Sequence, residues 1–140
     1  MQQVIVDTDI LSEILKGVNL TVGKRKAAYE ADFQQLTFTS PSVMEILTGY
    51  RKRGAPAQQQ RAATLFSLNT EIVPDNADYR LAAEINGDLL SKGQIIGMVD
   101  PLIAACAIRR GFGVASGNTR HFEFIRQAGY SIHLENWREP

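Results

Sequence analysis

The sequence contains one cysteine, no excess of either charge and no long apolar run. Cys106 alone cannot form an intrachain disulfide, and no Cys/His spacing suits a zinc site. Fifteen lysines and arginines balance fifteen aspartates and glutamates, so the chain lacks the overall basic charge of a general nucleic-acid binder. The apolar stretches are far shorter than the ~20 residues of a membrane span. These absences exclude a disulfide scaffold, a zinc module and a membrane-spanning helix.

The N-terminus also lacks the features of a signal peptide. The segment 1–4 (MQQV) has neither a charged region nor an apolar region behind it. Together with the lone cysteine, this favours a reducing, cytoplasmic location. The 140 residues, 44% of them hydrophobic and 21% charged, match the size and composition of one ordinary globular domain. We therefore expect a single domain over residues 1–140.

Short apolar runs alternate with helical patterns along the chain. Val4–Val6 is a β-branched run typical of a parallel strand buried on both faces. Similar runs predict strands over 36–39, 71–73, 113–116 and 130–134. Helical spacing predicts helices over about 10–16, 20–33, 40–53, 57–68, 75–92, 100–110 and 122–126. Strands that alternate with helices predict an α/β fold with a mostly parallel central sheet flanked by helices.

Several helix starts carry capping signals. Ser40 before Pro41 predicts Ser40 as an N-cap with proline at the first helical position. Asp100 before Pro101 has the same signature, and Asp75 precedes the long fifth helix. Capping does not exclude metal binding, because a carboxylate can accept backbone N–H bonds and still ligate an ion.

Polar side chains follow two of the expected strands. Asp7 comes directly after Val4–Val6, and Asn118 follows the strand at 113–116. Glu45 and Asp100 lie near the starts of two helices, so all four residues are expected near the carboxyl ends of the strands, where open α/β sheets bind ligands. Each acid taken singly is also explained as a cap or a surface residue. Converging carboxylates repel each other unless a cation is bound, and Mg²⁺ or Mn²⁺ prefers such oxygen ligands and supports phosphodiester cleavage.

Four segments resemble the motifs of PIN-domain ribonucleases, in particular the VapC-type toxins of bacterial toxin–antitoxin modules. In chain order they are 4–12 (VIVDTDILS), 42–47 (SVMEIL), 100–107 (DPLIAACA) and 113–122 (GVASGNTRHF). The motifs occur in family order at family-like spacing, and the resemblance covers essentially the whole chain. It implies a PIN-like three-layer α/β fold.

The resemblance also implies an activity and its partners. It implies a Mg²⁺- or Mn²⁺-dependent endoribonuclease in which a metal-activated water attacks the phosphodiester. A cognate antitoxin would occupy the active-site cleft and hold the toxin inactive, and members commonly form homodimers. The implied metal ligands are Asp7, Glu45 and Asp100, and Asn118 takes the fourth catalytic position. Thr8 or Ser116 is expected to position a water or a carboxylate.

The chain departs from the family pattern at two positions. Asn118 is neutral where many members carry aspartate, and His121 stands where the family usually has an acid before Phe122. Glu123 is the nearest replacement, although its shifted position turns it to another side of the helical turn. His121 either contacts a phosphate, ligates the metal or is an exposed polar residue. Three acids favour one tightly bound ion over two.

Basic residues near these motifs are candidates for RNA contact. They are Arg51, Lys52 and Arg53 at the end of the helix that carries Glu45, together with Arg120. Phosphate contacts of this kind make binding weaken with salt, and single-stranded or looped RNA is the expected target. The other basic runs, 24–26 and 109–110, are expected to be solvated.

A phosphatase of the haloacid-dehalogenase type is one alternative. Its first motif resembles Asp7-Thr8-Asp9, which follows an apolar strand. That family also needs a downstream lysine and a further acidic pair, and no lysine follows Lys92. This alternative is therefore disfavoured.

A catalytically silenced PIN-fold binding module is the other alternative. The neutral Asn118 and His121 support it, whereas retention of Asp7, Glu45 and Asp100 argues against it, because convergent acids are costly without a cation.

Overall fold

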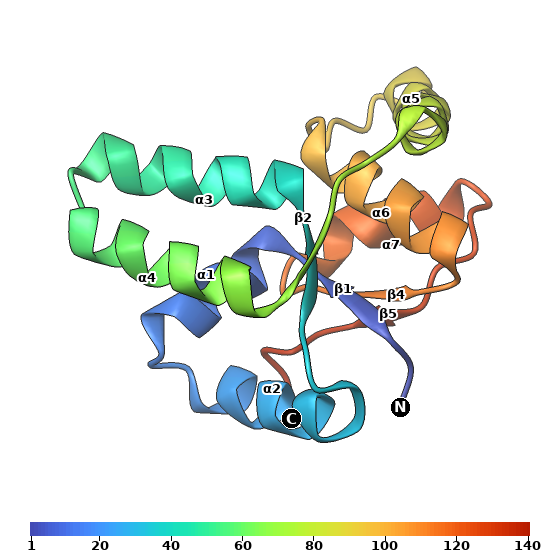
Figure 1. Cartoon of the computed structure of the whole chain (residues 1–140). Helices are drawn as coiled ribbons and strands as arrows, with labels where there is room; N and C mark the ends of the chain where they lie inside the picture. The colour runs from blue at the N-terminus through green and yellow to red at the C-terminus, as the bar shows by residue number, and fades with distance from the viewer.

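Five short strands run through the middle of the molecule, and seven helices surround them (Figure 1). The computed structural model describes residues 1–140. In chain order the elements are β1 (Val4–Val6), α1 (Thr8–Lys16), α2 (Leu20–Phe33), β2 (Thr37–Thr39), α3 (Ser40–Arg53), α4 (Pro56–Leu68), β3 (Thr70–Ile72), α5 (Asn76–Ser91), α6 (Val99–Arg110), β4 (Gly113–Ala115), α7 (Thr119–Gln127) and β5 (Leu134–Glu135). None of the helices combines the length and the apolar character needed to cross a membrane.

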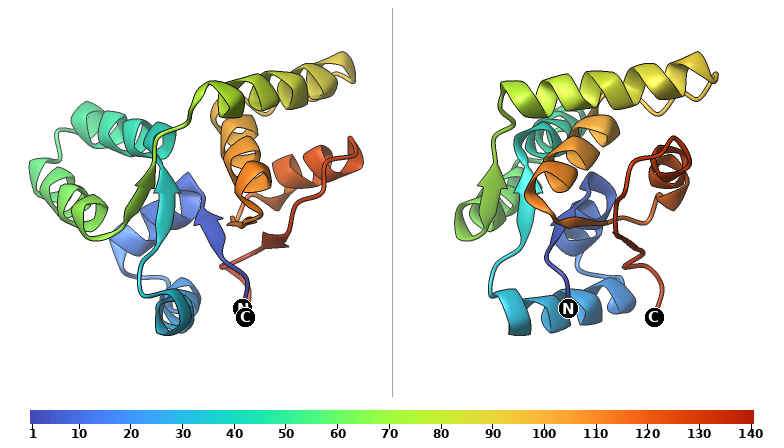
Figure 2. Two further views of the ribbon diagram at one scale, coloured as in Figure 1. Left: turned by 45° about the vertical axis from the view of Figure 1, so that its right-hand side comes forward. Right: turned by 90° about the vertical axis from the view of Figure 1, so that its right-hand side faces the viewer.

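All strand pairs are parallel. β4 pairs with β1 on one side and with β5 on the other, and β2 pairs with β3. β1 lies beside β2, so the two groups of strands form one central layer. Helices α1–α4 lie on one side of this layer and α5–α7 on the other (Figures 1 and 2). The expected three-layer α/β fold with a parallel central sheet is confirmed.

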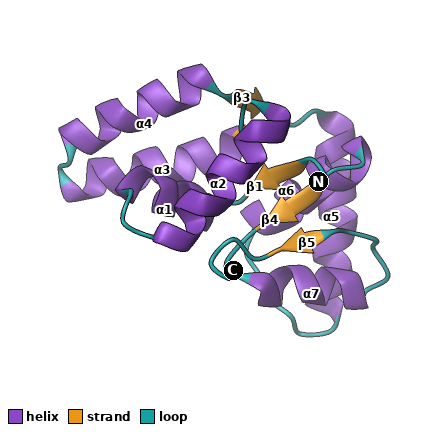
Figure 3. Cartoon of the chain, turned by 90° about the horizontal axis from the view of Figure 1, so that it is seen from below, coloured by secondary structure: helices purple, strands orange, loops and turns teal.

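The side chains of β1 point alternately to the two faces of the sheet and so contribute to both halves of the hydrophobic core. Ile5 packs with α5–α7, whereas Val4 and Val6 pack with α1–α4, and all three side chains are fully buried. Successive strand residues point to opposite faces, so a strand with helices on both sides has no polar position. Asp7 follows as the first polar residue, and its N–H donates to the carbonyl of Ala115 at the end of β4. Seen from below, β1, β4 and β5 lie between the two groups of helices (Figure 3).

Two of the predicted N-caps are wrong. The cap of α3 is Thr39, and the Ser40 hydroxyl instead donates to Oε2 of Glu71 at 2.6 Å, because parallel pairing of β2 with β3 places that carboxylate beside it. The cap of α6 is Met98, so Asp100 lies inside the first turn. Its carboxylate is therefore not used as a cap and is available to other partners.

The final strand is shorter and later than the predicted 130–134. Only Leu134–Glu135 pairs, with Val114 and Ala115 of β4. β4 itself has three residues, so the earlier apolar residues of that segment have no strand partner. They cover the core as a loop instead.

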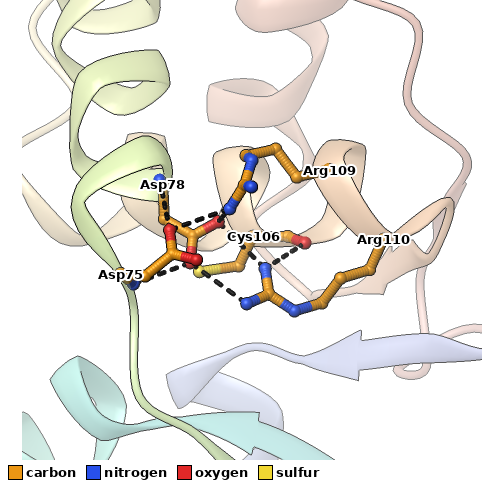
Figure 4. A network of polar contacts seen from close by, with 5 residues as sticks. All are labelled: Asp75, Asp78, Cys106, Arg109 and Arg110. Carbon is orange, nitrogen blue, oxygen red and sulfur yellow. Dashed lines mark hydrogen bonds and ion pairs between the residues drawn. The ribbon is translucent and has the colours of Figure 1, made fainter.

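A buried carboxylate ties α5 to α6 (Figure 4). Asp78 is 0% exposed and accepts from Arg109 Nη1 at 2.9 Å and from Arg110 Nη1 and Nη2 at 2.9 and 3.1 Å. Asp75 is the N-cap of α5, as predicted, and forms a capping box with Asp78. Arg109 and Arg110 are thus ion-pair partners rather than the solvated run expected from the sequence. Burial alone would raise the pKa of Asp78, but bonds from Arg110, the Asp75 backbone and Arg109 outweigh it and hold that pKa well below its usual range.

Candidate active site

Three acids from separate elements lie at the carboxyl end of the central strands. Asp7 ends β1, Glu45 lies in α3, and Asp100 lies in the first turn of α6. The negative charge of Asp100 raises the pKa of Asp7, and that of Glu45 raises the pKa of Asp100, so the three carboxylates share one electrostatic environment. Their convergence follows from parallel pairing, because β1 and β4 end at the same edge of the sheet.

Asp7 is the most deeply buried of these acids. It is 3% exposed, and its two oxygens accept from the Thr8 N–H at 2.7 Å and from the Ser116 hydroxyl at 2.8 Å. It caps α1, so its capping role and its place in the acid cluster coexist. Burial, then the charges of Asp100 and Asp9, raise the pKa of Asp7 well above its usual value, and the two hydrogen bonds do not offset this. A buried carboxylate whose pKa is raised in this way is stabilised in its charged form by a nearby cation.

Asp100 is held by a short contact from α7. Its Oδ2 lies 2.6 Å from Nδ1 of His121, and Nδ2 of Asn118 lies 3.1 Å from the same ring nitrogen. Burial raises the pKa of Asp100, the contact with His121 lowers it, and the charges of Glu45 and Asp9 raise it, with a net upward shift. Because Nδ1 is engaged, Nε2 is the ring atom of His121 left for a ligand. The structure thus places His121 and Asn118 with the acids.

Glu45 is the exposed member of the cluster and is held by α1. The Thr8 hydroxyl donates to Oε1 of Glu45 at 2.8 Å and lies 2.8 Å from the Ser42 hydroxyl. Ser42 is buried and also lies 3.3 Å from the hydroxyl of Thr39. The Thr8 hydroxyl therefore holds a carboxylate in place, whereas Ser42 was not among the predicted supporting residues. Its position three residues before Glu45, on the same face of α3, was the available signal.

Asp9 is a fourth acid of the cluster, although it was not among the site residues predicted from the sequence. Its Oδ2 accepts from the Gly117 N–H at 2.9 Å, and its Oδ1 is buried with no hydrogen-bond partner. Its charge raises the pKa of both Asp7 and Asp100. The signal in the sequence was its spacing, two residues after Asp7 at the start of α1.

A groove of about 690 Å³ leads away from the acids between α1, α3 and α4. Thr8 and Glu45 lie in its wall, and its basic lining residues are Lys16, Arg53 and Arg61. Of the predicted RNA contacts, only Arg53 lines this groove. Lys16 and Arg61 come from α1 and α4, and no local sequence pattern indicates that they lie near Glu45.

The other predicted residues point elsewhere. Glu123 pairs with Arg126 at 2.8 Å, and the Arg120 guanidinium lies 5.3 Å from the centroid of the Phe124 ring. Arg51 and Lys52 line a separate hollow on the outer side of α3 and α4. Glu123 is therefore engaged with Arg126 on α7, whereas the partner of Asp100 is His121.

The donor chemistry of the cluster fits a hard divalent cation. All the carboxylates are oxygen ligands of the kind that Mg²⁺ and Mn²⁺ prefer, and the buried Oδ1 of Asp9 has no other partner. As the side chains stand, no three acidic, imidazole or thiol groups are arranged to hold an ion. The residues present thus suit a cation in type and charge, although the side chains in their present positions do not enclose one.

Known proteins resemble this chain over nearly its full length. The chain is 26% identical over 142 residues to the tRNA(fMet)-specific endonuclease VapC of Shigella flexneri, covering 98% of this chain and 99% of that protein. It is also 26% identical over 110 residues to the VapC of the same name from Salmonella typhimurium, covering 78% and 80%.

Solved structures show the same fold. DNA-bound VapBC from Salmonella typhimurium matches with a TM-score of 0.80 at 25% identity, covering 98% of this chain and 99% of that chain. A toxin–antitoxin complex from Klebsiella pneumoniae matches with a TM-score of 0.67 at 21% identity, covering 86% and 90%. The model of the PIN domain family matches residues 4–128, most of the chain and all four predicted motifs. The chain therefore belongs to the PIN domain family.

Proposed function

We propose that this chain is a Mg²⁺- or Mn²⁺-dependent endoribonuclease that acts as the toxin of a toxin–antitoxin pair. The observation that carries the proposal is the convergence of Asp7, Glu45 and Asp100 in a PIN domain, where the charge of Asp100 destabilises the Asp7 carboxylate and the charge of Glu45 destabilises that of Asp100. The similarity to endonucleases named VapC supports the same activity.

In this proposal the acids bind the cation, and neighbouring hydroxyl groups keep the acids in position by hydrogen bonds. Asp7, Glu45 and Asp100 are the metal ligands, and Ser116 and Thr8 fix two of them by hydrogen bonds of 2.8 Å. A bound divalent ion activates water and offsets the charge that develops on a phosphodiester during cleavage. Removing the repulsion between the carboxylates also makes the cluster more stable when loaded than when empty.

His121 and Asn118 complete the site without adding negative charge. His121 orients Asp100 through Nδ1 and presents Nε2 to the substrate side, where a phosphate oxygen is a suitable partner. Asn118 supplies an amide next to His121 in place of a fourth carboxylate. With these two neutral groups, we propose one tightly bound ion rather than two.

The basic groove is the proposed path of the RNA. Lys16, Arg53 and Arg61 line it on the way to Glu45, at positions suited to backbone phosphates. Single-stranded or looped RNA suits an open groove, since its bases are free to leave the stack. Because the similar proteins are named as tRNA(fMet)-specific, a tRNA is the first substrate to test.

A cognate antitoxin that occupies the cleft is the proposed regulator. The support is the resemblance to VapC-type toxins and the structural match to VapBC. A homodimer and a cytoplasmic location complete this proposal. Co-purification with the antitoxin and sedimentation of the purified chain test the two assemblies separately.

The competing function is a silenced PIN module that binds a partner without cutting RNA. The neutral Asn118 and His121 favour it, as does the absence of three donors arranged around an ion. Mn²⁺ titration separates the two functions, since a silenced module has no need of the ion.

The decisive experiment is cleavage of a mixed tRNA and rRNA pool by the wild-type chain and by Asp7→Asn, in Mg²⁺, Mn²⁺ or EDTA. We expect cutting that requires both the metal and Asp7, with cut ends that identify the target. Cutting that persists in EDTA or in the variant contradicts the proposal. No cutting together with no Mn²⁺ binding establishes the silenced module instead.

A further inference from the structure

The segment after β5 returns along the molecule and is anchored at two points. Trp137 is buried, its ring packs against Tyr29 with centroids 5.6 Å apart, and its Nε1 donates to Glu135 at 3.1 Å. Arg25 of α2 donates to the backbone carbonyls of Glu139 and Pro140. The residue between these anchors, Arg138, is therefore held at a defined place on the surface.

That place is beside the acid cluster. Nη2 of Arg138 lies 3.8 Å from Oδ2 of Asp9 and 3.7 Å from Oε1 of Glu13, one helical turn further along α1. The Arg138 side chain is 43% exposed, and that of Asp9 is 25% exposed. Ion pairs of this length and exposure contribute little to global stability. The contact therefore affects the positions of the neighbouring side chains rather than the stability of the whole fold.

The backbone of Gly117 is in close contact with the side chains of both Arg138 and Asp9. A Cβ at this position would lie 2.7 Å from Cδ and 2.8 Å from Nε of Arg138, and 2.8 Å from Oδ2 of Asp9. A side chain at this position would force Arg138 or Asp9 to shift, because the arginine stem covers the Gly117 backbone while Asp9 accepts the Gly117 N–H. The turn that follows carries Asn118, whose N–H donates to the hydroxyl of Ser116, the residue that binds Asp7.

We infer that Arg138 is a positioning residue: it fixes Asp9 and the Gly117 turn, and through them the arrangement of the acid cluster. This inference rests on the proposed function, because the arrangement matters only if the cluster holds a cation. Arg138 is also a positive charge, and as a charge alone it opposes cation binding. The two roles predict opposite effects of its removal, which makes them separable.

The test compares Arg138→Ala, Arg138→Lys and the control Arg80→Ala in the full chain. Arg80 is exposed on α5, and its side chain has no ion pair or hydrogen bond. The first measurement is hydrogen exchange of the Gly117 amide, whose protection comes from Asp9. We expect exchange about tenfold faster in Arg138→Ala, near-wild-type exchange in Arg138→Lys and no change in Arg80→Ala.

The second measurement is the Mn²⁺ dissociation constant by calorimetry at 20 °C, with each variant first shown to be folded. We expect Mn²⁺ binding about threefold to tenfold weaker in Arg138→Ala, with recovery in Arg138→Lys. Tighter binding in Arg138→Ala assigns the residue a charge role only and overturns the inference. Unchanged Gly117 exchange in Arg138→Ala overturns it as well, whatever the Mn²⁺ result. A wild-type chain that binds no Mn²⁺ refutes the proposed metal dependence instead, and Gly117 exchange alone then decides for or against the positioning role.

Discussion

The Nδ1 atom of His121 lies 2.6 Å from Oδ2 of Asp100, so an imidazole near the start of α7 supports a carboxylate in the first turn of α6. The two residues come from α7 and α6 and are 21 positions apart. The contact lowers the pKa of Asp100 against the stronger effect of burial. The imidazole therefore stabilises the charged Asp100 carboxylate, whereas another carboxylate at this position would repel it.

The first prediction concerns His121. Replacing His121 with alanine removes the support of Asp100, and we expect cleavage to fall about 10- to 100-fold, as for other residues that orient a metal ligand. His121→Asp adds a carboxylate beside Asp100, so we expect the metal-free variant to melt at a lower temperature and to gain more from Mn²⁺ than the wild type does. Thermal unfolding with and without Mn²⁺ measures this difference. An equal gain in the two proteins contradicts the assigned role.

The second prediction concerns Asp7 and pH. The folded-state pKa of Asp7 is raised, so the stability that it contributes at acid pH is lost as the pH rises from the ordinary value of 3.8 through the higher folded value. Asp7→Asn keeps the size and removes the charge. We expect this variant, in EDTA at pH 8, to melt about 2–5 °C above the wild type, with a smaller difference at pH 5. Mn²⁺ should stabilise the wild type only. A variant that is less stable than the wild type at pH 8 would count against the electrostatic account of the site.

The third prediction concerns the basic groove. In an Asp100→Asn background that binds RNA without cutting it, Arg53→Ala and Arg61→Ala should each weaken binding of a single-stranded RNA. Each should also reduce the slope of log affinity against log salt by about 0.7, the value for one phosphate contact on a single strand. Arg51→Ala is the matched control, because Arg51 is exposed on α3 but lines a different hollow. Equal losses in Arg51 and Arg53 variants would mean that the groove does not direct the RNA.

The fourth prediction concerns the network of Figure 4. Asp78→Asn leaves Arg109 and Arg110 without their buried anion, and we expect unfolding in urea at pH 7 to be easier by about 2–4 kcal/mol. The pKa of Asp78 is lowered, so its contribution is present above the ordinary value of 3.8 and is lost as the pH falls through the lower folded value. The difference between variant and wild type should therefore shrink in acid.

The control for this prediction is Asp32→Asn, which removes an exposed carboxylate from α2 that has no partner. It should change the free energy of unfolding by less than about 0.5 kcal/mol. Cleavage by Asp78→Asn should stay normal at temperatures where it is folded, since the network lies outside the acid cluster. A loss in Asp78→Asn no larger than in the control would remove the structural role assigned to this ion-pair network.

Local patterns predicted most of the elements and three of the acids. The fully apolar run before Asp7 identified a strand with helices on both sides, and the helices predicted to end at residues 16 and 110 do end there, each followed by a glycine in the left-handed conformation, Gly17 and Gly111. Periodicity and capping act over a few residues, so the sequence reports them directly. The same short range explains the errors at Ser40 and Asp100, whose side chains find partners on other elements rather than on their own helix.

Local sequence patterns thus set the order of strands and helices and the acids that end or begin them. The packing of distant segments selects which polar groups join those acids. Asp9 meets Gly117 across 108 positions, and Ser42 meets Thr8 across 34. Arg61 reaches the groove because α4 packs back on α1 and α3. Contacts at such separation depend on how helices pack on both sides of a parallel sheet, and no local period encodes that packing.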